Sequence, residues 1–335
     1  MNISKLNEII KAEPAYRLDQ INKALFCDFL ENWEEATVLP KDLRDLLNQE
    51  CPLNIIAEIF ESEDKKTIKA LITFDDNNSV ETVLMRYKDN KNTACISSQI
   101  GCQLNCDFCA TGKLGFKRNL KSNEIVEQII FWERFLKKQE QKVTSIVFMG
   151  MGEPFLNYDQ VLEAIRIIND KDKINLGGRH ISISTSGIIE GIKKLADEPL
   201  QINLAFSLNA PDNDLRNKLM PINKMYPLEK VLKALAEYIE KTNRKVMIEY
   251  VLIKDINDSK LQAMELAEIL KENLPKLFMV NLIPYNPTEK YQSSPVEKIK
   301  IFREVLEQKG IEVTQRQRFG RHILGACGQL SGKKN

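Results

Sequence analysis

From residue 143 onward the chain alternates between strand-like and helix-like segments, and this alternation limits the possible folds more than any other feature of its 335 residues. Six candidate strands lie at residues 143–149, 180–186, 202–208, 245–253, 277–283 and 311–317. Amphipathic segments with helical spacing separate most of these strands. Repeated strand–helix units form a parallel sheet with helices outside, either an open doubly wound sheet or a barrel. One more strand leads into a cysteine-rich loop and gives about six core strands before the final one. A complete barrel needs eight strands. We therefore expect an α/β fold with a partial (β/α)6 barrel.

Residues 1–75 differ from the rest of the chain in pattern and in charge. Segments 4–12, 18–30 and 40–50 have the helical spacing of apolar residues, and the whole stretch carries nine basic against fifteen acidic residues. We expect three parts: a small helical N-terminal accessory domain over 1–75, a barrel with its lead-in strands over 76–320, and a C-terminal extension over 321–335.

Composition excludes several classes of protein. With 43% apolar residues the chain is too hydrophobic for intrinsic disorder, and its seven cysteines are too few for a disulfide scaffold. The longest stretch without a charge, 92–106, is too short and too polar to cross a membrane. Residues 1–14 lack the apolar core of a signal peptide, so we expect a cytoplasmic protein with no membrane partner. Only His180 and His322 are histidines, and we expect both to be structural or surface residues.

Polar segments that contain glycine or proline follow several of the predicted strands. They are GMGEPFLN (150–157), STSG (184–187), SLNAPDNDLR (207–216) and IPYNP (283–287). In parallel α/β sheets, chemistry takes place at the carboxyl ends of the strands. Packing alone does not require these residue types on one rim, so we expect the functional site there.

Cys102, Cys106 and Cys109 form a C-x3-C-x2-C motif, the most informative short pattern in the chain. Three thiolates on one loop can bind three irons of a [4Fe–4S] cluster and leave the fourth iron open. The amine and carboxylate of S-adenosylmethionine suit that open position, and an electron passed to its sulfonium produces a 5′-deoxyadenosyl radical. The alternative is a structural zinc site with Cys95 as the fourth ligand, although zinc ribbons usually pair two C-x2-C knuckles and this chain has one.

The turn from Gly150 to Pro154 also fits a ligand site. Glycines allow a ligand to approach the backbone closely, and backbone groups with the Glu153 carboxylate can hold the ammonium of a sulfonium ligand. An ordinary strand-to-helix turn is the alternative. No Gly-Lys-Ser/Thr follows, so the turn is not a P-loop.

Taken together, the motifs resemble the RlmN/Cfr group of radical-SAM RNA methyltransferases. In order along the chain, the matching segments are CISSQIGCQLNCDFCATGKLGFKRNL, FMGMGEPFLN, STSG, SLNAPDNDLR, LIPYNP and ACGQL. The resemblance extends from Glu81 to Leu330, and the acidic N-terminal part is similar to the accessory domain of that family. It implies a radical-SAM barrel with a [4Fe–4S] cluster on Cys102, Cys106 and Cys109.

The resemblance also implies how a methyl group would be joined to adenine. Carbon 2 of the ring and the methyl of a sulfonium are both electrophiles, so polar transfer cannot join them. In this family one S-adenosylmethionine methylates a protein cysteine, and a second is cleaved to a radical that takes a hydrogen from the S-methyl group. The carbon radical adds to the base. A second cysteine then resolves the protein–RNA adduct by forming a disulfide, while a base removes the ring proton.

By position in the motifs, Cys327 resembles the methyl-carrying cysteine, Cys95 the resolving cysteine and Glu81 the proton acceptor. The positions that match contacts to S-adenosylmethionine are Gly152, Glu153, Ser184, Ser207, Leu208, Asn209 and Asn286. Without the resemblance, the two cysteines could equally be a small buried residue and an idle thiol, and Glu81 a solvent-facing strand residue. Cys27 and Cys51 match no motif, and we expect both to be core thiols.

Two branches of the family differ in the atom that they methylate. One methylates carbon 2 of an adenosine in 23S rRNA and often of an adenosine in tRNA, and the other methylates carbon 8 of the same rRNA adenosine and confers antibiotic resistance. Pro154 after Gly-Met-Gly-Glu is typical of the carbon-2 branch, which we favour. The segment 315–324 departs from the Arg-Gly-Asp-Asp-Ile run of that branch, and Asn209 replaces a common histidine.

Two other functions stay open on the sequence alone. A radical-SAM enzyme for a peptide or small molecule would not require Cys95 and Cys327 together. A zinc-stabilised RNA-binding module would not need the strand-exit motifs. For the favoured function, the resemblance implies 23S rRNA and tRNA as partners, with an electron donor such as flavodoxin or ferredoxin, and we expect a monomer.

The net charge of +1 is an average over opposed regions. Residues 1–75 carry a net charge of −6, whereas residues 309–335 carry +5. A basic run lies beside the cysteine motif and consists of Lys113, Lys117, Arg118 and Lys121. We expect the phosphate backbone of RNA to approach there.

Overall fold

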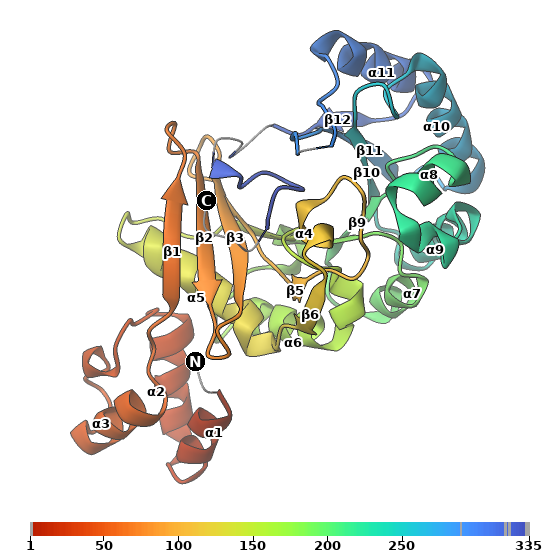
Figure 1. Cartoon of the computed structure of the whole chain (residues 1–335). Coiled ribbons are helices and arrows are strands. Elements are labelled where there is room, and N and C mark those ends of the chain that lie inside the picture. Colours follow the sequence, from red (N-terminus) through yellow and green to blue (C-terminus); the bar gives the residue numbers. More distant parts are fainter. Residues whose placement is uncertain (1–2, 289, 318–319, 321–322, 332–335) are drawn as a thin grey trace.

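Ten strands form one mixed sheet in the computed structural model, which describes residues 3–288, 290–317, 320 and 323–331 (Figure 1). In order across the sheet they are β1 (Ile56–Glu61), β2 (Thr67–Thr73), β3 (Ser79–Arg86), β4 (Asn92–Cys95), β7 (Ser145–Phe148), β8 (Ile181–Thr185), β9 (Asn203–Ser207), β10 (Val246–Leu252), β11 (Phe278–Pro284) and β12 (Val313–Gln315). The pairings from β1 to β4 are antiparallel. Those from β4 to β12 are parallel. Within the described residues no pairing joins β1 to β12, so the sheet does not close.

The expected partial barrel is confirmed. The six candidate strands between residues 143 and 317 are β7 to β12, and β4 is the strand that leads into the cysteine loop. Parallel strands covered on both faces are continuous apolar runs rather than alternating ones. β10 follows this rule, because all but one of its seven residues are buried.

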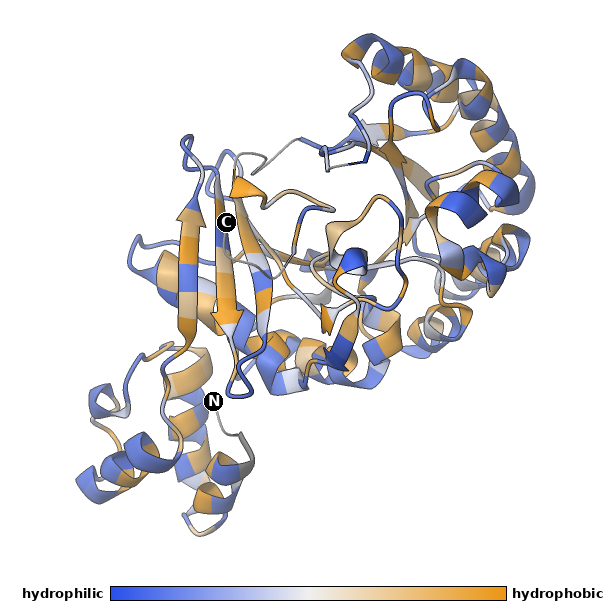
Figure 2. Cartoon of the chain, in the orientation of Figure 1, coloured by the Kyte–Doolittle hydropathy of each residue, from blue (hydrophilic) through white to orange (hydrophobic). Residues whose placement is uncertain are grey.

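Helices cover the outer face of the parallel strands (Figure 1). They are α5 (Ser122–Lys137), α6 (Tyr158–Asn169), α7 (Ile189–Asp197), α8 (Asn213–Leu219), α9 (Leu228–Thr242), α10 (Lys260–Asn273) and α11 (Val296–Gln308), with the single turns η2 (Pro154–Asn157), η3 (Gly178–His180) and η4 (Pro221–Lys224). Figure 2 shows that these helices are divided into hydrophilic and hydrophobic faces, as helices on a core are. In the described part of the chain, no helix has the length and apolar character needed to cross a membrane.

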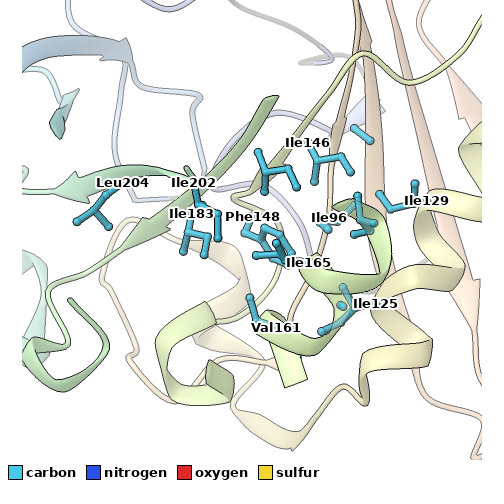
Figure 3. Packing of buried hydrophobic residues seen from close by; sticks show 14 of the residues in the cluster. Ile96, Ile125, Ile129, Ile146, Phe148, Val161, Ile165, Ile183, Ile202 and Leu204 are labelled. Atoms are coloured by element: carbon cyan, nitrogen blue, oxygen red, sulfur yellow. The ribbon is translucent and has the colours of Figure 1, made fainter. Parts of the chain in front are cut away.

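The core between sheet and helices is aliphatic. Figure 3 shows Phe148 of β7 and Ile183 of β8 lying against Val161 and Ile165 of α6. Each of these side chains is at most 1% exposed. Burying one such side chain stabilises the fold by about 1.5–3 kcal/mol, so this packing fixes the strands whose ends carry the polar motifs.

A small second sheet frames the cysteine loop. β5 (Gln99–Gly101) and β6 (Phe116–Asn119) pair antiparallel on either side of the loop and of the short helix α4 (Ala110–Lys113). Gly101 has φ +76°, and a β-carbon there would lie 1.8 Å from the Gly115 carbonyl oxygen. That carbonyl accepts the Cys102 N–H at 3.0 Å, so the close approach that needs glycine also fixes the start of the motif.

The N-terminal part contains the three expected helices, α1 (Ile3–Lys11), α2 (Ala15–Phe26) and α3 (Lys41–Glu50), with the single turn η1 (Trp33–Glu35). The helical assignment of the remaining residues up to 75 is wrong, because β1 and β2 form a hairpin that extends the main sheet through β3. The spacing of Ile55, Ile56, Ile59 and Phe60 suits either a helix or a strand. Pairing with β2, which is buried along almost its whole length, selects the strand, and no local pattern reveals that pairing.

Candidate functional site

One cavity brings together four reactive or polar side chains from distant parts of the chain. Cys95 ends β4, Asn286 follows β11, Arg316 follows β12, and Cys327 lies in the C-terminal segment. The rest of the wall consists of Gln317, Gly325 and the apolar residues Val83, Met85, Met149, Ile283, Pro284, Ala326 and Leu330. This cysteine cavity therefore holds the two cysteines that were expected to act as a pair, and both are free thiols.

The surroundings of the two thiols disfavour their ionisation. Burial raises the pKa of Cys95 to about 12. Cys327 is exposed as a residue, but desolvation of its thiol by the surrounding protein still raises the pKa to about 11. The Arg316 guanidinium opposes both increases in pKa, because a nearby positive charge favours a thiolate. Both thiols are therefore protonated at neutral pH, and each must lose its proton before it can act as a nucleophile.

Arg316 connects the cysteine cavity to the neighbouring strand ends. Its Nη1 lies 3.5 Å from Oε1 of Glu249 on β10, and its Nη2 donates to the sulfur of Met149 at 3.1 Å. The other Glu249 oxygen accepts a hydrogen bond from Ser184 Oγ at 2.8 Å. Ser184 Oγ in turn lies 3.3 Å from Ser207 Oγ. A continuous line of polar contacts thus joins the cysteine pair to two residues expected to bind S-adenosylmethionine.

Cys102, Cys106 and Cys109 lie on the loop between β5 and α4. Burial raises the pKa of Cys102 to about 12 and that of Cys106 well above its ordinary value, and the neighbouring Cys109 raises both further. The Glu153 carboxylate is also close enough to raise the pKa of Cys102. The three thiols therefore lie near one another and beside the Gly150–Pro154 turn.

The donor set of this loop fits a cluster better than a single ion. Across residues 3–288, 290–317, 320 and 323–331, no group of three His, Cys, Asp or Glu side chains is arranged to hold one metal ion. A [4Fe–4S] cluster does not need that arrangement, because each thiolate binds a different iron. Cys95, the fourth ligand in the zinc alternative, lines the cysteine cavity, which none of the three loop cysteines lines. A metal centre on the loop would supply the positive charge that displaces protons from the buried thiols.

The Gly152–Glu153 turn has a defined geometry. Glu153 is 3% exposed and accepts the N–H groups of Phe155 at 3.2 Å and Ser186 at 2.8 Å, while its own N–H donates to Gln99 Oε1 at 2.8 Å. Burial raises the pKa of the Glu153 carboxyl, and the hydrogen bonds oppose that rise. Gly152 has φ +99°, and a β-carbon on it would lie 2.6 Å from the Gln99 β-carbon. The glycine is therefore required by both backbone conformation and space.

Ser207, Leu208 and Asn209 lie where β9 ends. Leu208 is fully buried, and Asn209 adopts the left-handed conformation with φ +61°, which asparagine tolerates better than most residues. The Asn209 amide oxygen accepts the Val251 N–H at 2.9 Å. The asparagine that replaces the common histidine therefore ties the end of β9 to β10.

Asn286 has a polar atom that suits a ligand. Its Nδ2 donates to the Cys327 carbonyl oxygen at 3.2 Å, whereas its buried Oδ1 has no hydrogen-bond partner among the described residues. A buried acceptor without a partner is costly. An N–H donor on a bound ligand, such as an amino group of S-adenosylmethionine, would satisfy it.

Glu81 lies on β3 and is fully buried, so its interpretation as a solvent-facing strand residue is wrong. Its Oε1 lies 2.8 Å from Nζ of Lys69, and its Oε2 accepts the Ser331 N–H. Glu81 is not among the residues that line the cysteine cavity. The structure therefore places it against the C-terminal segment that carries Cys327, outside the cavity wall.

Three charged residues of the site were not predicted from the sequence. Glu249 and Arg316 are described above. The third is Arg216, which is fully buried and donates to the carbonyl oxygens of Ser186, at 2.7 Å, and Leu208, at 3.1 Å. It thus joins the ends of β8 and β9. One signal was available: Glu249 is a lone charged residue inside an apolar strand.

One peripheral expectation is corrected and two hold. Cys51 is buried as expected, whereas Cys27 is exposed, because it ends α2 on the surface. His180 is exposed, and His322 lies outside the described residues. In the basic run, Arg118 is already paired, with Asp76 at 2.6 Å and with Glu124 at 2.8 Å. The exposed lysines of that run are Lys113, Lys117 and Lys121.

Comparison with known proteins gives one consistent result. Residues 96–267 match the model of the Radical SAM superfamily, whose members use a [4Fe–4S] cluster and S-adenosylmethionine. The chain is 43% identical to "Probable dual-specificity RNA methyltransferase RlmN" of Dictyoglomus thermophilum, over 98% of this chain and 94% of that one. It is 44% identical to the protein of the same name from Carboxydothermus hydrogenoformans, over 96% and 93%. A crystal structure of a radical SAM methyltransferase from Sphaerobacter thermophilus, 40% identical, superposes with a TM-score of 0.94 over 99% of this chain and 98% of that one. The chain therefore belongs to the RlmN family of radical-SAM RNA methyltransferases.

Proposed function

We propose that this enzyme methylates carbon 2 of an adenosine in 23S rRNA and of an adenosine in tRNA, through a methyl group carried on Cys327. The observation that carries the proposal is the presence of Cys95 and Cys327 on one cavity. A radical-SAM enzyme acting on a peptide or small molecule has no need of this pair. The relatives' name, dual-specificity RNA methyltransferase, supports the two RNA substrates.

Cys102, Cys106 and Cys109 would hold the [4Fe–4S] cluster in this proposal. When bound, the cluster supplies an electron that cleaves S-adenosylmethionine to a 5′-deoxyadenosyl radical. Glu153, beside Cys102, is positioned to orient the amino end of S-adenosylmethionine, together with the backbone at Gly152. Ser184, Ser207, Leu208, Asn209 and Asn286 would complete the binding site, with the unpartnered Asn286 oxygen as an acceptor.

The two cysteines divide the transfer between them. Cys327 would take a methyl group from one S-adenosylmethionine, and the radical from a second would remove a hydrogen atom from that methyl group. The methylene radical would then add to carbon 2, and the adduct would lose the carbon-2 proton and one electron, which the cluster can take back. Cys95 loses its proton and attacks the Cys327 sulfur. The sulfur–sulfur bond forms, the sulfur–carbon bond breaks, and its electron pair stays on the methylene carbon, which takes up a proton to become the methyl group. A thiol reductant then reopens the disulfide.

Glu81 would take the proton from carbon 2. Its support is position: the carboxylate lies beside the segment that carries Cys327, and one of its oxygens accepts the Ser331 N–H. The use of two S-adenosylmethionine molecules per turnover belongs to the same proposal. The flavodoxin- or ferredoxin-type electron donor, the monomeric state and the cytoplasmic location stay predictions from the sequence.

Carbon 8 of the same rRNA adenosine is the second candidate target. Pro154 favours carbon 2, because the carbon-8 branch tends to lack it, and here Pro154 is buried at the first position of η2. The test is mass spectrometry of nucleosides from 23S rRNA and tRNA transcripts after incubation with anaerobically purified, iron-loaded enzyme, S-adenosylmethionine and a reductant. We expect 2-methyladenosine in both RNAs and none with the C327A variant. Formation of 8-methyladenosine instead would overturn the carbon-2 assignment, and unchanged methylation by C327A would overturn the carrier role.

A further inference from the structure

A lysine and a glutamate form an ion pair inside the sheet extension. Lys69 of β2 and Glu81 of β3 are both fully buried, and Lys69 Nζ lies 2.8 Å from Glu81 Oε1. The same ammonium lies 4.9 Å from the centre of the Phe60 ring on β1. Replacing a buried ion pair of this kind by apolar residues is often neutral or stabilising. Stability of the sheet alone therefore does not account for its presence.

The second oxygen of Glu81 is used outside the sheet. Oε2 accepts the N–H of Ser331, which belongs to the C-terminal segment that carries Cys327. A hydrogen bond to a charged acceptor is roughly twice as strong as one between neutral groups. Glu81 thus presents one charged oxygen to the C-terminal segment, while Lys69 pairs with its other oxygen.

The rest of the segment is held by neutral hydrogen bonds next to the cysteine loop. The Ala110 N–H donates to the Gly328 carbonyl at 2.8 Å, and the Thr111 hydroxyl donates to the Leu330 carbonyl at 2.7 Å. Both donors follow the loop motif directly in the sequence. Figure 1 shows the C-terminal segment, in dark blue, lying between β3 and α4. Two more neutral bonds join the segment to the chain after β11: Asn286 Nδ2 donates to the Cys327 carbonyl at 3.2 Å, and Gln329 Nε2 donates to the Pro287 carbonyl at 3.0 Å. Among these five anchors of the described segment, the bond to Glu81 is the one that involves a charged group.

We propose that Lys69 is a positioning residue, which holds the Glu81 carboxylate where it accepts the Ser331 N–H and so fixes Cys327 beside the cysteine loop. The inference deepens the proposed function, since it assigns a residue that places the methyl-carrying cysteine. Without the ammonium, the buried carboxylate would lose the positive charge 2.8 Å from its Oε1, and it would move or take up a proton. In either case the charged anchor of the segment is lost.

The test is hydrogen–deuterium exchange of the iron-loaded enzyme, followed in the peptide covering residues 323–331. The K69M variant keeps an unbranched side chain of similar length and removes the charge. We expect exchange in this peptide to become about tenfold faster, as loss of a charge-assisted hydrogen bond implies, with unchanged exchange in the parallel strands. K245M is the matched control, because Lys245 pairs with Glu312 on the surface at 2.7 Å, and it should leave the peptide unchanged.

A second variant leaves the buried pair intact. S331P removes the N–H that Glu81 accepts, on an accessible part of the chain, and should give a similar acceleration. If K69M does not fold, the K69M/E81Q double variant removes both charges of the buried pair and still lacks the charged anchor, so we expect faster exchange there too. Exchange within twofold of the parent enzyme in any of these folded variants would overturn the proposal.

A functional readout separates this inference from the function on which it rests. In K69M and S331P we expect transfer of a methyl group from S-adenosylmethionine to Cys327, read from the intact protein mass, to be about tenfold slower at unchanged iron content. Transfer at the parent rate would contradict the positioning role. If the parent enzyme itself never methylates Cys327, the proposed function fails, whereas the exchange result still decides whether Lys69 anchors the segment.

Discussion

Arg316 lines the cysteine cavity between a carboxylate that it pairs with and two thiols whose ionisation it favours. Burial raises the pKa of Cys95 to about 12, so at pH 7 only a very small fraction of this thiol is a thiolate. Tyr87, Cys327 and Glu249 are the other titratable groups that interact with Cys95 or Arg316. The Cys327 thiol and the Glu249 carboxylate raise the pKa of Cys95, whereas the Arg316 guanidinium and, more weakly, a backbone hydrogen bond at Met149 lower it. The guanidinium is therefore the side chain that favours the attack of Cys95.

We predict that R316Q slows alkylation of Cys95 by iodoacetamide about tenfold. Loss of the guanidinium would raise the pKa of the Cys95 thiol by about one unit, and the thiolate fraction would fall about tenfold. Only the thiolate reacts, and because its pKa lies above the measured range, the rate in the parent should rise about tenfold per pH unit from pH 7 to pH 10. R316Q should give a parallel line at lower rates, measured by peptide mass spectrometry. R316K retains the charge and should stay within about threefold of the parent. Identical rates in the parent and R316Q would contradict the role assigned to the guanidinium.

Among the individual site residues, those that could be predicted from the sequence are of a rare type and have a specific spacing. The three loop cysteines, Cys95 and Cys327 all belong to short motifs, and the structure places the last two on one cavity. Arg316 and Glu249 could not be found in that way. Each is a common charged residue whose role depends on pairing between β10 and the chain after β12, and a local pattern does not contain that pairing.

The Gly150–Pro154 turn shows how a single element places a functional group. Glu153 reaches the Ser186 N–H at the end of β8 only because the backbone at Gly152 adopts φ +99° beside Gln99. Such a conformation costs a non-glycine residue about 1–3 kcal/mol. The turn therefore couples the position of the carboxylate to a conformation that only glycine adopts easily.

We predict that G152A weakens binding of S-adenosylmethionine to the iron-loaded enzyme more than tenfold, measured by isothermal titration calorimetry. The new methyl group would lie 2.6 Å from the Gln99 β-carbon, so the turn and Glu153 must shift. G310A is the matched control, because Gly310 has φ +78° and open space around its α-carbon. It should lower thermal stability slightly and leave the affinity unchanged. Equal affinities in G152A and the parent would contradict the assignment of this turn to the ligand.

Helices and strands were predictable where the local sequence pattern alone determines them. The parallel strands β7 to β12 are strand-like segments separated by amphipathic helices, and all six occur where they were expected. β1 and β2 were not expected, because β1 is an edge strand without a buried residue, and the three-residue spacing of Glu58 and Glu61 also suits a helix. Its state is decided by the hairpin with β2, a tertiary contact.

At the scale of the whole molecule, the sheet brings the two ends of a long sequence to one place. The strands β3 and β4 come from the first third of the chain and the segment 323–331 from its end, yet Glu81, Cys95 and Cys327 lie on or beside one cavity wall. The two ends of the chain also carry opposite charge: residues 1–75 have a net charge of −6, and residues 309–335 have a net charge of +5. The near-zero total is therefore compatible with an enzyme that meets a polyanion at one face.

The most direct test of the central claim is the search for a covalent protein–RNA species in the C95A variant. Iron-loaded C95A is incubated with S-adenosylmethionine, a reductant and the RNA substrate, separated under denaturing conditions, digested with nuclease and protease, and analysed by mass spectrometry. We predict a peptide containing Cys327 joined through a methylene carbon to adenosine, and no such peptide in the parent or in C27A, which lacks only the exposed thiol of α2. Release of methylated RNA by C95A at the parent rate, with no adduct on Cys327, would contradict the account.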